Sequence, residues 1–104
     1  MYSNYKLEGH TPVECANLAE WGEWLQGADK RVALDRINGV DISTVFLGID
    51  YQFGEGPPLL FETMVFGGKL DAEQERYGTW DEAEAGHQAM KQRVILAENE
   101  GRGD

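Results

Sequence analysis

The stretch KRVALDRINGVDISTVFL, residues 30–47, decides the fold class of this chain. Asn38-Gly39 separates two runs that are rich in β-branched residues, and this dipeptide favours two-residue hairpin turns because both of its residues tolerate positive φ angles. The second run alternates apolar and polar residues from Val40 to Ser43 and is apolar on both faces over residues 45–47. Such a run is typical of a central strand. The sequence therefore predicts an antiparallel strand pair that turns at Asn38-Gly39.

Two further segments extend this pair into a sheet. Leu59–Phe66 reads as a third strand that closes at Gly67-Gly68, after a turn rich in glycine and proline over residues 53–58. A short strand around residues 5–7 supplies a fourth, and the polar segment Lys69–Gly78 is expected to be a connection. The prediction is an antiparallel sheet of three to four strands.

The first helix is expected to begin at Thr11-Pro12-Val13-Glu14. Threonine can cap a helix, proline fits its first position, and glutamate lies three residues after the cap. The helix should end near Gly27. One helical stripe would then contain the following residues, with Trp21 beside it: Cys15, Leu18, Gly22 and Leu25.

The second helix is expected to begin after Thr79, because Glu82 again lies three residues after the cap and Asp81 adds a second acid to the first turn. It should end near Ala97. Its buried stripe is predicted to consist of four residues spaced three or four apart: Ala83, His87, Met90 and Val94. Gly22 and Gly86 each lie inside a predicted helix, where glycine costs about 1 kcal/mol relative to alanine, so close approach of each helix to the sheet is expected in return.

The length of the chain allows one hydrophobic core. A chain of 104 residues buries about two thirds of its unfolded surface, and its eleven aromatic residues supply large apolar side chains for one core. We expect a single α+β domain over residues 1–97, with two helices packed on the antiparallel sheet. The polar, glycine-rich residues 98–104 are expected to form a flexible tail.

Composition and charge argue against several classes of function. Nineteen acids and nine Lys and Arg residues give a net charge of −10, whereas nucleic acids and anionic membranes attract a basic surface. We therefore expect no direct contact with nucleic acid and none with a membrane. The single cysteine, Cys15, is expected to be a small buried apolar residue. The chain shows no signal peptide and no apolar run of membrane-spanning length, so a cytoplasmic protein is predicted.

The acidity is concentrated in residues 71–84, where Arg76 is the only base. That segment is either a solvated loop and helix start, in which acids favour the N-terminus of the helix, or a surface that meets a basic partner. A solvated face usually mixes the two signs, and this keeps the second interpretation open. The predicted partner-binding residues are Asp71, Glu73, Glu75, Asp81, Glu82 and Glu84.

No motif indicates catalysis, a metal or a cofactor. His10 and His87 are the only histidines, and with one cysteine they give none of the ligand spacings of zinc sites. His87 is expected to be a partly buried imidazole with satisfied hydrogen bonds, because it lies on the apolar stripe of the second helix. A pairing of Cys15 with a histidine lacks a local signature. We predict no enzyme, no metal and no cofactor.

Four segments carry a resemblance to a known group of proteins. Residues 43–50, 56–68, 75–77 and 79–87, which include GPPLLFETMVFGG and TWDEAEAGH, resemble small uncharacterised proteins encoded in bacteriophage and prophage genomes. The resemblance covers roughly residues 40–87. It implies a small accessory protein that is encoded by a phage and acts in its host cell, and it carries no biochemical activity.

These observations lead to hypotheses of different classes. The first is a non-enzymatic accessory protein that binds a basic surface of a host protein, one form of which is an inhibitor of a nucleic-acid-directed defence system. The alternative is a structural or assembly protein that forms a homo-oligomer through its sheet edges or through Trp21 and Trp24. A small-molecule-binding or enzymatic domain that uses His87 ranks last.

Overall fold

The computed structural model describes residues 3–50 and 56–100. Its elements are β1 (Tyr5–Glu8), β2 (Thr11–Glu14), α1 (Leu18–Gly27), β3 (Arg31–Ile37), β4 (Val40–Phe46), β5 (Phe61–Phe66), β6 (Gln74–Tyr77) and α2 (Trp80–Glu100). They form a two-stranded antiparallel sheet, β1-β2, and a four-stranded antiparallel sheet in the order β3-β4-β5-β6. The α+β class is therefore confirmed.

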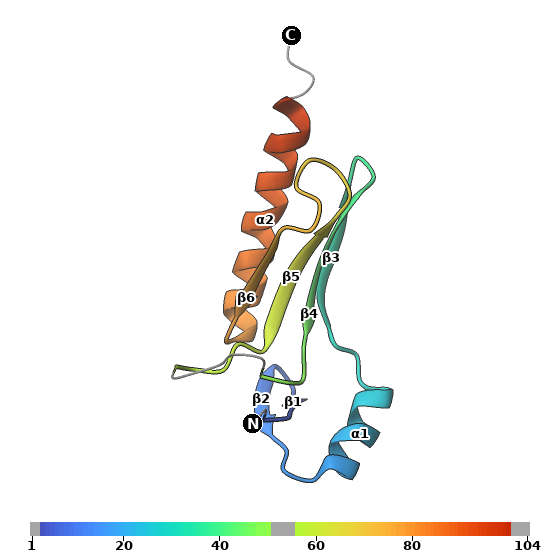
Figure 1. Ribbon diagram of the computed structural model, residues 1–104, viewed down its shortest axis with the longest axis vertical. Coiled ribbons are helices and arrows are strands. Elements are labelled where there is room, and N and C mark those ends of the chain that lie inside the picture. The colour runs from blue at the N-terminus through green and yellow to red at the C-terminus, as the bar shows by residue number, and fades with distance from the viewer. Residues whose placement is uncertain (1–2, 51–55, 101–104) are drawn as a thin grey trace.

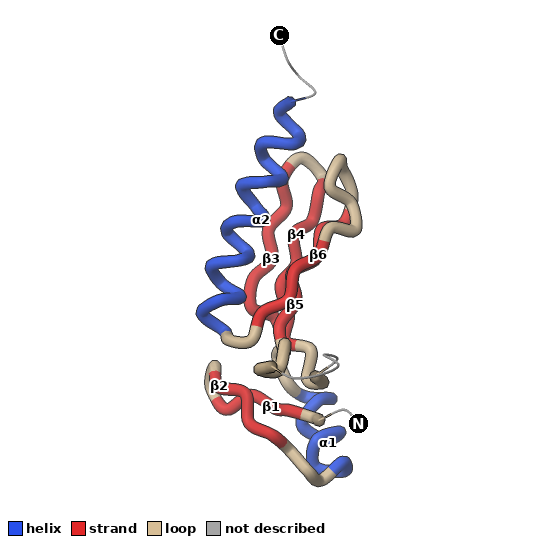
Figure 2. Tube along the Cα trace, turned by 60° about the vertical axis from the view of Figure 1, so that its left-hand side comes forward, coloured by secondary structure: helices blue, strands red, loops and turns tan. Residues whose placement is uncertain are grey.

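The molecule is elongated, measuring 57 × 31 × 20 Å (Figure 1). The long helix α2 lies along one face of the four-stranded sheet, whereas β1, β2 and α1 gather at one end of it. Figure 2 shows the same two layers from another side, with α2 over one face of the sheet only. The N–H of Tyr5 donates to the carbonyl of Gly48 at 2.7 Å, which ties β1 to the chain that follows β4.

The central hairpin forms as predicted. Asn38 and Gly39 have φ angles of 50° and 81°, and Ile37 pairs with Val40 across the turn. β4 lies between β3 and β5, and its residues alternate between fully and partly buried positions from Val40 to Phe46. Alternation with a period of two gives each strand one face against α2 and one face away from it.

The fourth strand of this sheet is β6, and the expectation that Lys69–Gly78 is only a connection is wrong. Thr63 pairs with Glu75, and Glu62 pairs with Arg76. β6 is a four-residue edge strand, and its three polar side chains remain exposed to solvent. The alternation of apolar and polar residues that marks a half-buried strand is therefore missing from its sequence. The expected N-terminal strand does form, but it pairs with β2.

The predicted start of the first helix is also wrong. Thr11–Glu14 is strand β2, and α1 begins at Leu18 after Asn17, whose Oδ1 accepts the N–H of Glu20 at 3.0 Å. Gly9, with a φ of 62°, turns the chain back so that residues 11–14 pair with β1. A threonine followed by proline suits a short hairpin as well as a helix start, and here the cross-strand pairing prevails. The predicted end at Gly27 is confirmed.

α1 does not lie on the sheet face, contrary to the expectation of two helices packed there. It has no fully buried residue, and Leu18 is 67% exposed. The indole Nε1 of Trp21 donates to the carbonyl of Tyr5 at 3.0 Å, and Trp24 packs edge-on against Phe46. A Cβ added at Gly22 would meet nothing within 4 Å, so the expected close approach at this glycine is wrong.

α2 follows its prediction closely. Thr79 Oγ1 accepts the N–H of Glu82 at 3.1 Å, and the predicted stripe is fully buried. At Gly86 a Cβ would overlap the Tyr77 ring, so the close approach expected there is confirmed. The helix continues past the expected end at Ala97 to Glu100, because Glu98 Oε2 accepts the N–H of Lys69 at 2.9 Å and holds the last turn against the β5–β6 connection. Of the expected tail, residues 101–104 lie outside the described residues.

The core between α2 and the sheet consists of two apolar clusters. One contains Val40, Ile42, Val65, Met90 and Val94, and the other contains Phe46, Leu60, Phe61 and Ala83. Between the two clusters lie three buried polar residues, one on each of β4, β5 and α2: Thr44, Thr63 and His87. Cys15 is buried as predicted.

Candidate functional site

The buried polar layer is a chain of hydrogen bonds. His87 Nε2 lies 2.8 Å from Asp35 Oδ2, and His87 Nδ1 lies 2.7 Å from Thr44 Oγ1, which in turn bonds to Thr63 Oγ1. Lys91 Nζ lies 3.5 Å from the other oxygen of Asp35. The hydrogen bond from His87, helped by the positive charge of Lys91, lowers the pKa of Asp35 below its ordinary value.

This layer has the geometry of a structural link between β3, β4, β5 and α2. The imidazole of His87 and both threonine hydroxyls are wholly buried, and each bonds to a neighbour in the chain. His87 is thus more deeply buried than the sequence suggested, with the satisfied hydrogen bonds expected for it. A catalytic imidazole has to reach its substrate, so this enclosure gives no support to a reactive role for His87.

His10 and Cys15 do not form a reactive pair. The exposed ring of His10 stacks on Trp80, with ring centroids 3.7 Å apart and planes inclined by 3°. The buried Sγ of Cys15 lies 3.6 Å from the carbonyl oxygen of Asn17. Within residues 3–50 and 56–100, no group of three or more His, Cys, Asp or Glu side chains is placed to hold a metal ion.

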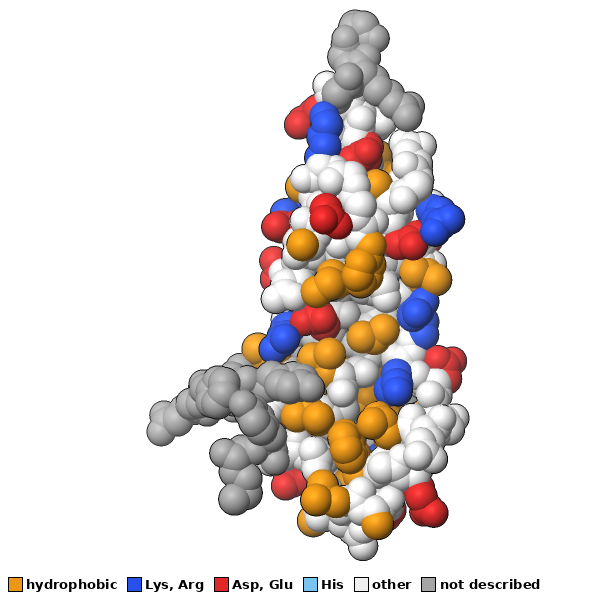
Figure 3. Space-filling model, turned by 45° about the vertical axis from the view of Figure 1, so that its right-hand side comes forward, with side chains coloured by type: hydrophobic (Ala, Val, Ile, Leu, Met, Phe, Trp, Pro, Cys, Tyr) orange, Lys and Arg blue, Asp and Glu red, His pale blue; other side chains and the backbone are white. Residues whose placement is uncertain are grey.

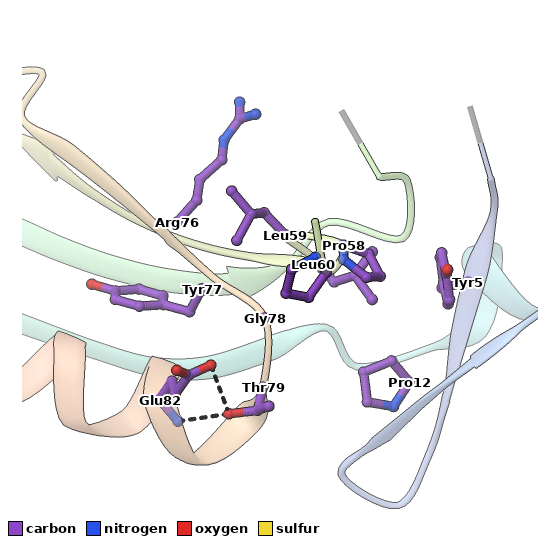
Figure 4. Close-up of a pocket in the computed structure, with 11 residues that line it drawn as sticks. Tyr5, Pro12, Pro58, Leu59, Leu60, Arg76, Tyr77, Gly78, Thr79 and Glu82 are labelled. Carbon is purple, nitrogen blue, oxygen red and sulfur yellow. Dashed lines mark hydrogen bonds between the residues drawn. The ribbon is translucent and has the colours of Figure 1, made fainter. Parts of the chain in front are cut away.

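A hollow of about 500 Å³ lies between the β1–β2 hairpin and the end of the sheet (Figure 4). Its lining is mainly apolar and includes Tyr5, Pro12 and Leu60. The polar groups at its border bond elsewhere: the Thr79 hydroxyl and the Glu82 carboxylate bond to each other at 3.2 Å, and Arg76 Nε donates to Glu62 at 2.9 Å. The described residues therefore bring no convergent set of unbonded charged or carboxamide groups into this hollow to orient a ligand.

The six predicted partner-binding residues are all exposed and fall into two groups. Asp71 and Glu73 precede β6 and Glu75 lies within it, whereas the other three lie in the first turns of α2. Half of the six bond within the chain. Asp71 Oδ1 accepts the N–H of Gly67 at 2.6 Å, Glu73 Oε1 pairs with Arg93 at 2.8 Å, and Glu82 bonds to Thr79.

The remaining acids, Glu75, Asp81 and Glu84, have no side-chain hydrogen bond or ion pair to any other described residue. Arg76, the only base in the segment, cannot neutralise them, because its side chain belongs to the other face of the sheet. It pairs there with Glu62, its cross-strand neighbour, whereas Glu75 shares its face with Thr63 and α2. We refer to the six acids along β6 and the start of α2 as the acidic edge.

A second surface was missed from the sequence: the face of the sheet opposite α2. Leu34 on β3 and Phe66 on β5 are 55% and 51% exposed, and Val45 and Met64 lie half-buried on the same face. Two cross-strand ion pairs border these residues, Arg36–Asp41 at 2.7 Å and Arg76–Glu62. Figure 3 shows the apolar side chains of this face gathered over the middle of the sheet. We refer to it as the open face.

The sequence holds only a weak signal for the open face. Residues 61–66, FETMVF, combine four apolar residues with Glu62 and Thr63, and these two adjacent polar residues do not show which face of the strand is exposed. The face that turns away from the core becomes clear only once α2 is placed over Phe61, Thr63 and Val65.

No family model, no curated protein and no solved structure matches this chain. None of the helices within the described residues has the length and apolar character needed to cross a membrane.

Proposed function

We propose that this chain is a non-enzymatic protein that binds a basic surface of another protein through the acidic edge. The observation that carries the proposal is the position of Arg76. This base lies in the middle of the acidic segment in the sequence, yet its guanidinium pairs with Glu62 on the open face. Among the described residues, the ion pair that the acidic edge makes is Glu73–Arg93, and the side chains of Glu75, Asp81 and Glu84 are left without one.

The chemistry of the acidic edge favours a partner with several basic groups. The side chains of Glu75, Asp81 and Glu84 are exposed and make no hydrogen bond or ion pair to another described residue, so a partner can pair with them without first breaking an internal ion pair. Complementary charges on two proteins speed their encounter and fix their relative orientation. The net charge of −10 adds a long-range attraction to the same partners.

The resemblance to small phage proteins suggests that the partner belongs to the host cell. A protein of this size that lacks a catalytic constellation can act by occupying the surface of a larger protein. Inhibition of a nucleic-acid-directed defence system is one form of this proposal, because the proteins of such systems carry basic surfaces for nucleic acid, which an acidic protein can occupy.

The test compares two variants that change the same number of charges. One replaces Glu75, Asp81 and Glu84 by lysine. The native chain is immobilised and exposed to host-cell lysate, and retained proteins are identified and quantified by mass spectrometry. We expect a specific basic protein to be retained, a loss of at least tenfold for the variant, and weaker retention as salt is raised, because salt screens exposed charges.

The control replaces three exposed acids outside the acidic edge, Glu8, Glu14 and Glu23, by lysine. Retention should persist in this control, apart from the general effect of net charge. Equal losses in the two variants would show that only net charge matters, and retention unaffected by either would contradict the proposed surface.

The second candidate function, a homo-oligomeric assembly protein, is favoured by a separate observation at the other edge of the four-stranded sheet: no strand within residues 3–50 and 56–100 pairs with the outer side of β3.

A further inference from the structure

A second, smaller hollow lies between β6 and α2, beside the acidic edge, and has a volume of about 230 Å³. We refer to it as the notch. On the α2 side, glycine at position 86 and alanine at position 89 leave the helix without a bulky side chain, and this opens the space beside β6. The residues that line the notch come from these two elements: Glu75, Tyr77, Gly86, Ala89, Met90 and Arg93.

Tyr77 brings a hydroxyl group to the notch. Its ring lies over Gly86, where an added Cβ would overlap Cε1, Cζ and the hydroxyl oxygen of the tyrosine. Figure 4 shows the hydroxyl of Tyr77 pointing along α2, away from Thr79 and Glu82. The hydroxyl is thus on the side of the notch, and it makes no hydrogen bond to another described residue.

Glu75 gives the notch its charge. It precedes Tyr77 by two residues on β6, so the two side chains belong to the same face of the strand. Its exposed carboxylate makes no hydrogen bond or ion pair to another described residue. The base in the lining, Arg93, pairs with Glu73 at 2.8 Å and places Nη1 3.5 Å from the sulfur of Met90. Glu73 offsets the charge of Arg93, and the notch is left with the negative charge of Glu75.

We propose that the notch receives one arginine side chain of the basic partner, an inference that rests on the proposed function and names the group that anchors the partner to the acidic edge. The aliphatic part of the arginine would lie on Ala89 and Met90, as long charged side chains commonly cover apolar surface. Its guanidinium would donate to the Glu75 carboxylate and to the Tyr77 hydroxyl. A charge-assisted hydrogen bond to a carboxylate is stronger than one between neutral groups.

The chemistry of the notch favours arginine over the other side chains that a partner can present. A guanidinium is planar and carries five donors, so one group can serve the carboxylate and the hydroxyl together. It is also less strongly hydrated than the ammonium of lysine, and a partly apolar hollow therefore costs it less desolvation. A neutral side chain would leave Glu75 unpaired, and an acidic one would be repelled by it.

The test uses acetyl-arginine amide as the probe and acetyl-citrulline amide as its uncharged analogue of almost the same shape. Each is titrated to high millimolar concentration into the ¹⁵N-labelled full chain, and amide chemical shifts are followed by nuclear magnetic resonance. We expect saturable shifts for the arginine probe, centred on Glu75, Tyr77, Gly86 and Ala89. The citrulline probe should bind about tenfold more weakly or not at all, because it cannot form the charge-assisted bond to Glu75.

Two variants locate the binding in the notch. Ala89→Leu fills the notch from an exposed helical position without changing any charge, and Glu75→Gln removes the charge while keeping the size of the side chain. Each should weaken the arginine probe about tenfold, and Ala89→Leu should also lower retention of the partner from lysate. The matched control is Gln88→Leu, because Gln88 is exposed on the same helix and does not line the notch. It should leave the binding unchanged.

Equal shifts with the two probes, no shifts with arginine, shifts centred on Asp81 and Glu84, or binding that survives both Ala89→Leu and Glu75→Gln would overturn the proposal. The proposed function would still hold if the lysine variant of Glu75, Asp81 and Glu84 lost the partner in any of these cases. A chain that binds the arginine probe in the notch yet retains no protein from lysate would contradict the proposed function instead, so the two failures are distinguishable.

Discussion

His87 shows how a single residue connects several elements. Its imidazole bonds to Asp35 on β3 and to Thr44 on β4 from a position on α2 that is wholly enclosed. Polar groups in a core are tolerated when each has a partner, and they fix the relative position of the elements that supply them. These hydrogen bonds therefore fix the position of α2 along the sheet, with one apolar cluster on each side of the polar layer.

Replacing His87 by alanine should lower the free energy of unfolding by about 2–4 kcal/mol, because the change leaves a cavity and deprives Thr44 of a buried partner. Urea unfolding followed by circular dichroism measures this loss. Gln88→Ala, on the exposed side of the same helix, should change the free energy by less than about 0.5 kcal/mol. Equal effects of the two substitutions would argue against a structural role for His87.

Asp35 gives the fold a defined sensitivity to acid. Its pKa is lowered in the folded state by the hydrogen bond from His87, helped by Lys91. A carboxyl group whose folded pKa lies below its unfolded value stabilises the fold above the unfolded value and loses that contribution as the pH falls through the folded pKa. The stabilisation should therefore be complete at neutral pH and decline below the ordinary pKa of 3.8.

The measurement is the difference in free energy of unfolding between the native chain and Asp35→Asn as a function of pH. We expect a constant difference above about pH 5 that shrinks below about pH 4, where Asp35 of the unfolded chain becomes protonated before Asp35 of the folded chain does. A difference that persists undiminished to strongly acidic pH would mean that the charge of Asp35 contributes nothing.

At the scale of elements, the two helices differ in how they meet the rest of the chain. α2 packs against the sheet with a fully buried stripe, whereas α1 has no fully buried residue and contacts the hairpin and the end of β4. The surroundings of the two helical glycines reflect this difference. A Cβ added at Gly86 would overlap the Tyr77 ring, whereas a Cβ added at Gly22 would meet nothing within 4 Å.

Alanine substitutions at these two glycines should have opposite signs. Gly22→Ala should stabilise the chain by about 0.5–1 kcal/mol through helix propensity, whereas Gly86→Ala should destabilise it by about 1–3 kcal/mol by displacing Tyr77. Melting temperatures of the two variants measure both effects. A stabilising Gly86→Ala would show that α2 and β6 are not packed as closely as described.

The elements differ in how far the sequence alone could predict them. Asn38-Gly39 and the Thr79 cap were predictable because their signals are local, and the buried stripe of α2 was predictable because helical spacing is regular. β6 and β2 were not, because their strand character comes from pairing with distant segments. Thr11-Pro12 carries local signals for a helix that the cross-strand pairing overrides.

At the scale of the whole molecule, the charge separates into distinct regions. The sequence shows where the acids concentrate, but only the alternation along β6 reveals that Arg76 belongs to the open face and Glu75 to the face against α2. The open face likewise depends on sheet order and strand phase, which composition does not determine. The acids could therefore be predicted, whereas the arrangement that turns Arg76 away from Glu75, Asp81 and Glu84 could not.

The measurement that tests the acidic edge most directly is zero-length cross-linking of the captured complex, in which a carbodiimide joins carboxylates to lysine amines in direct contact. Mass spectrometry of the digested product identifies the carboxylates that were joined. We predict cross-links from Glu75, Asp81 and Glu84 to lysines of the partner. Cross-links confined to acids outside the acidic edge, such as Glu8 and Glu14, would contradict the account.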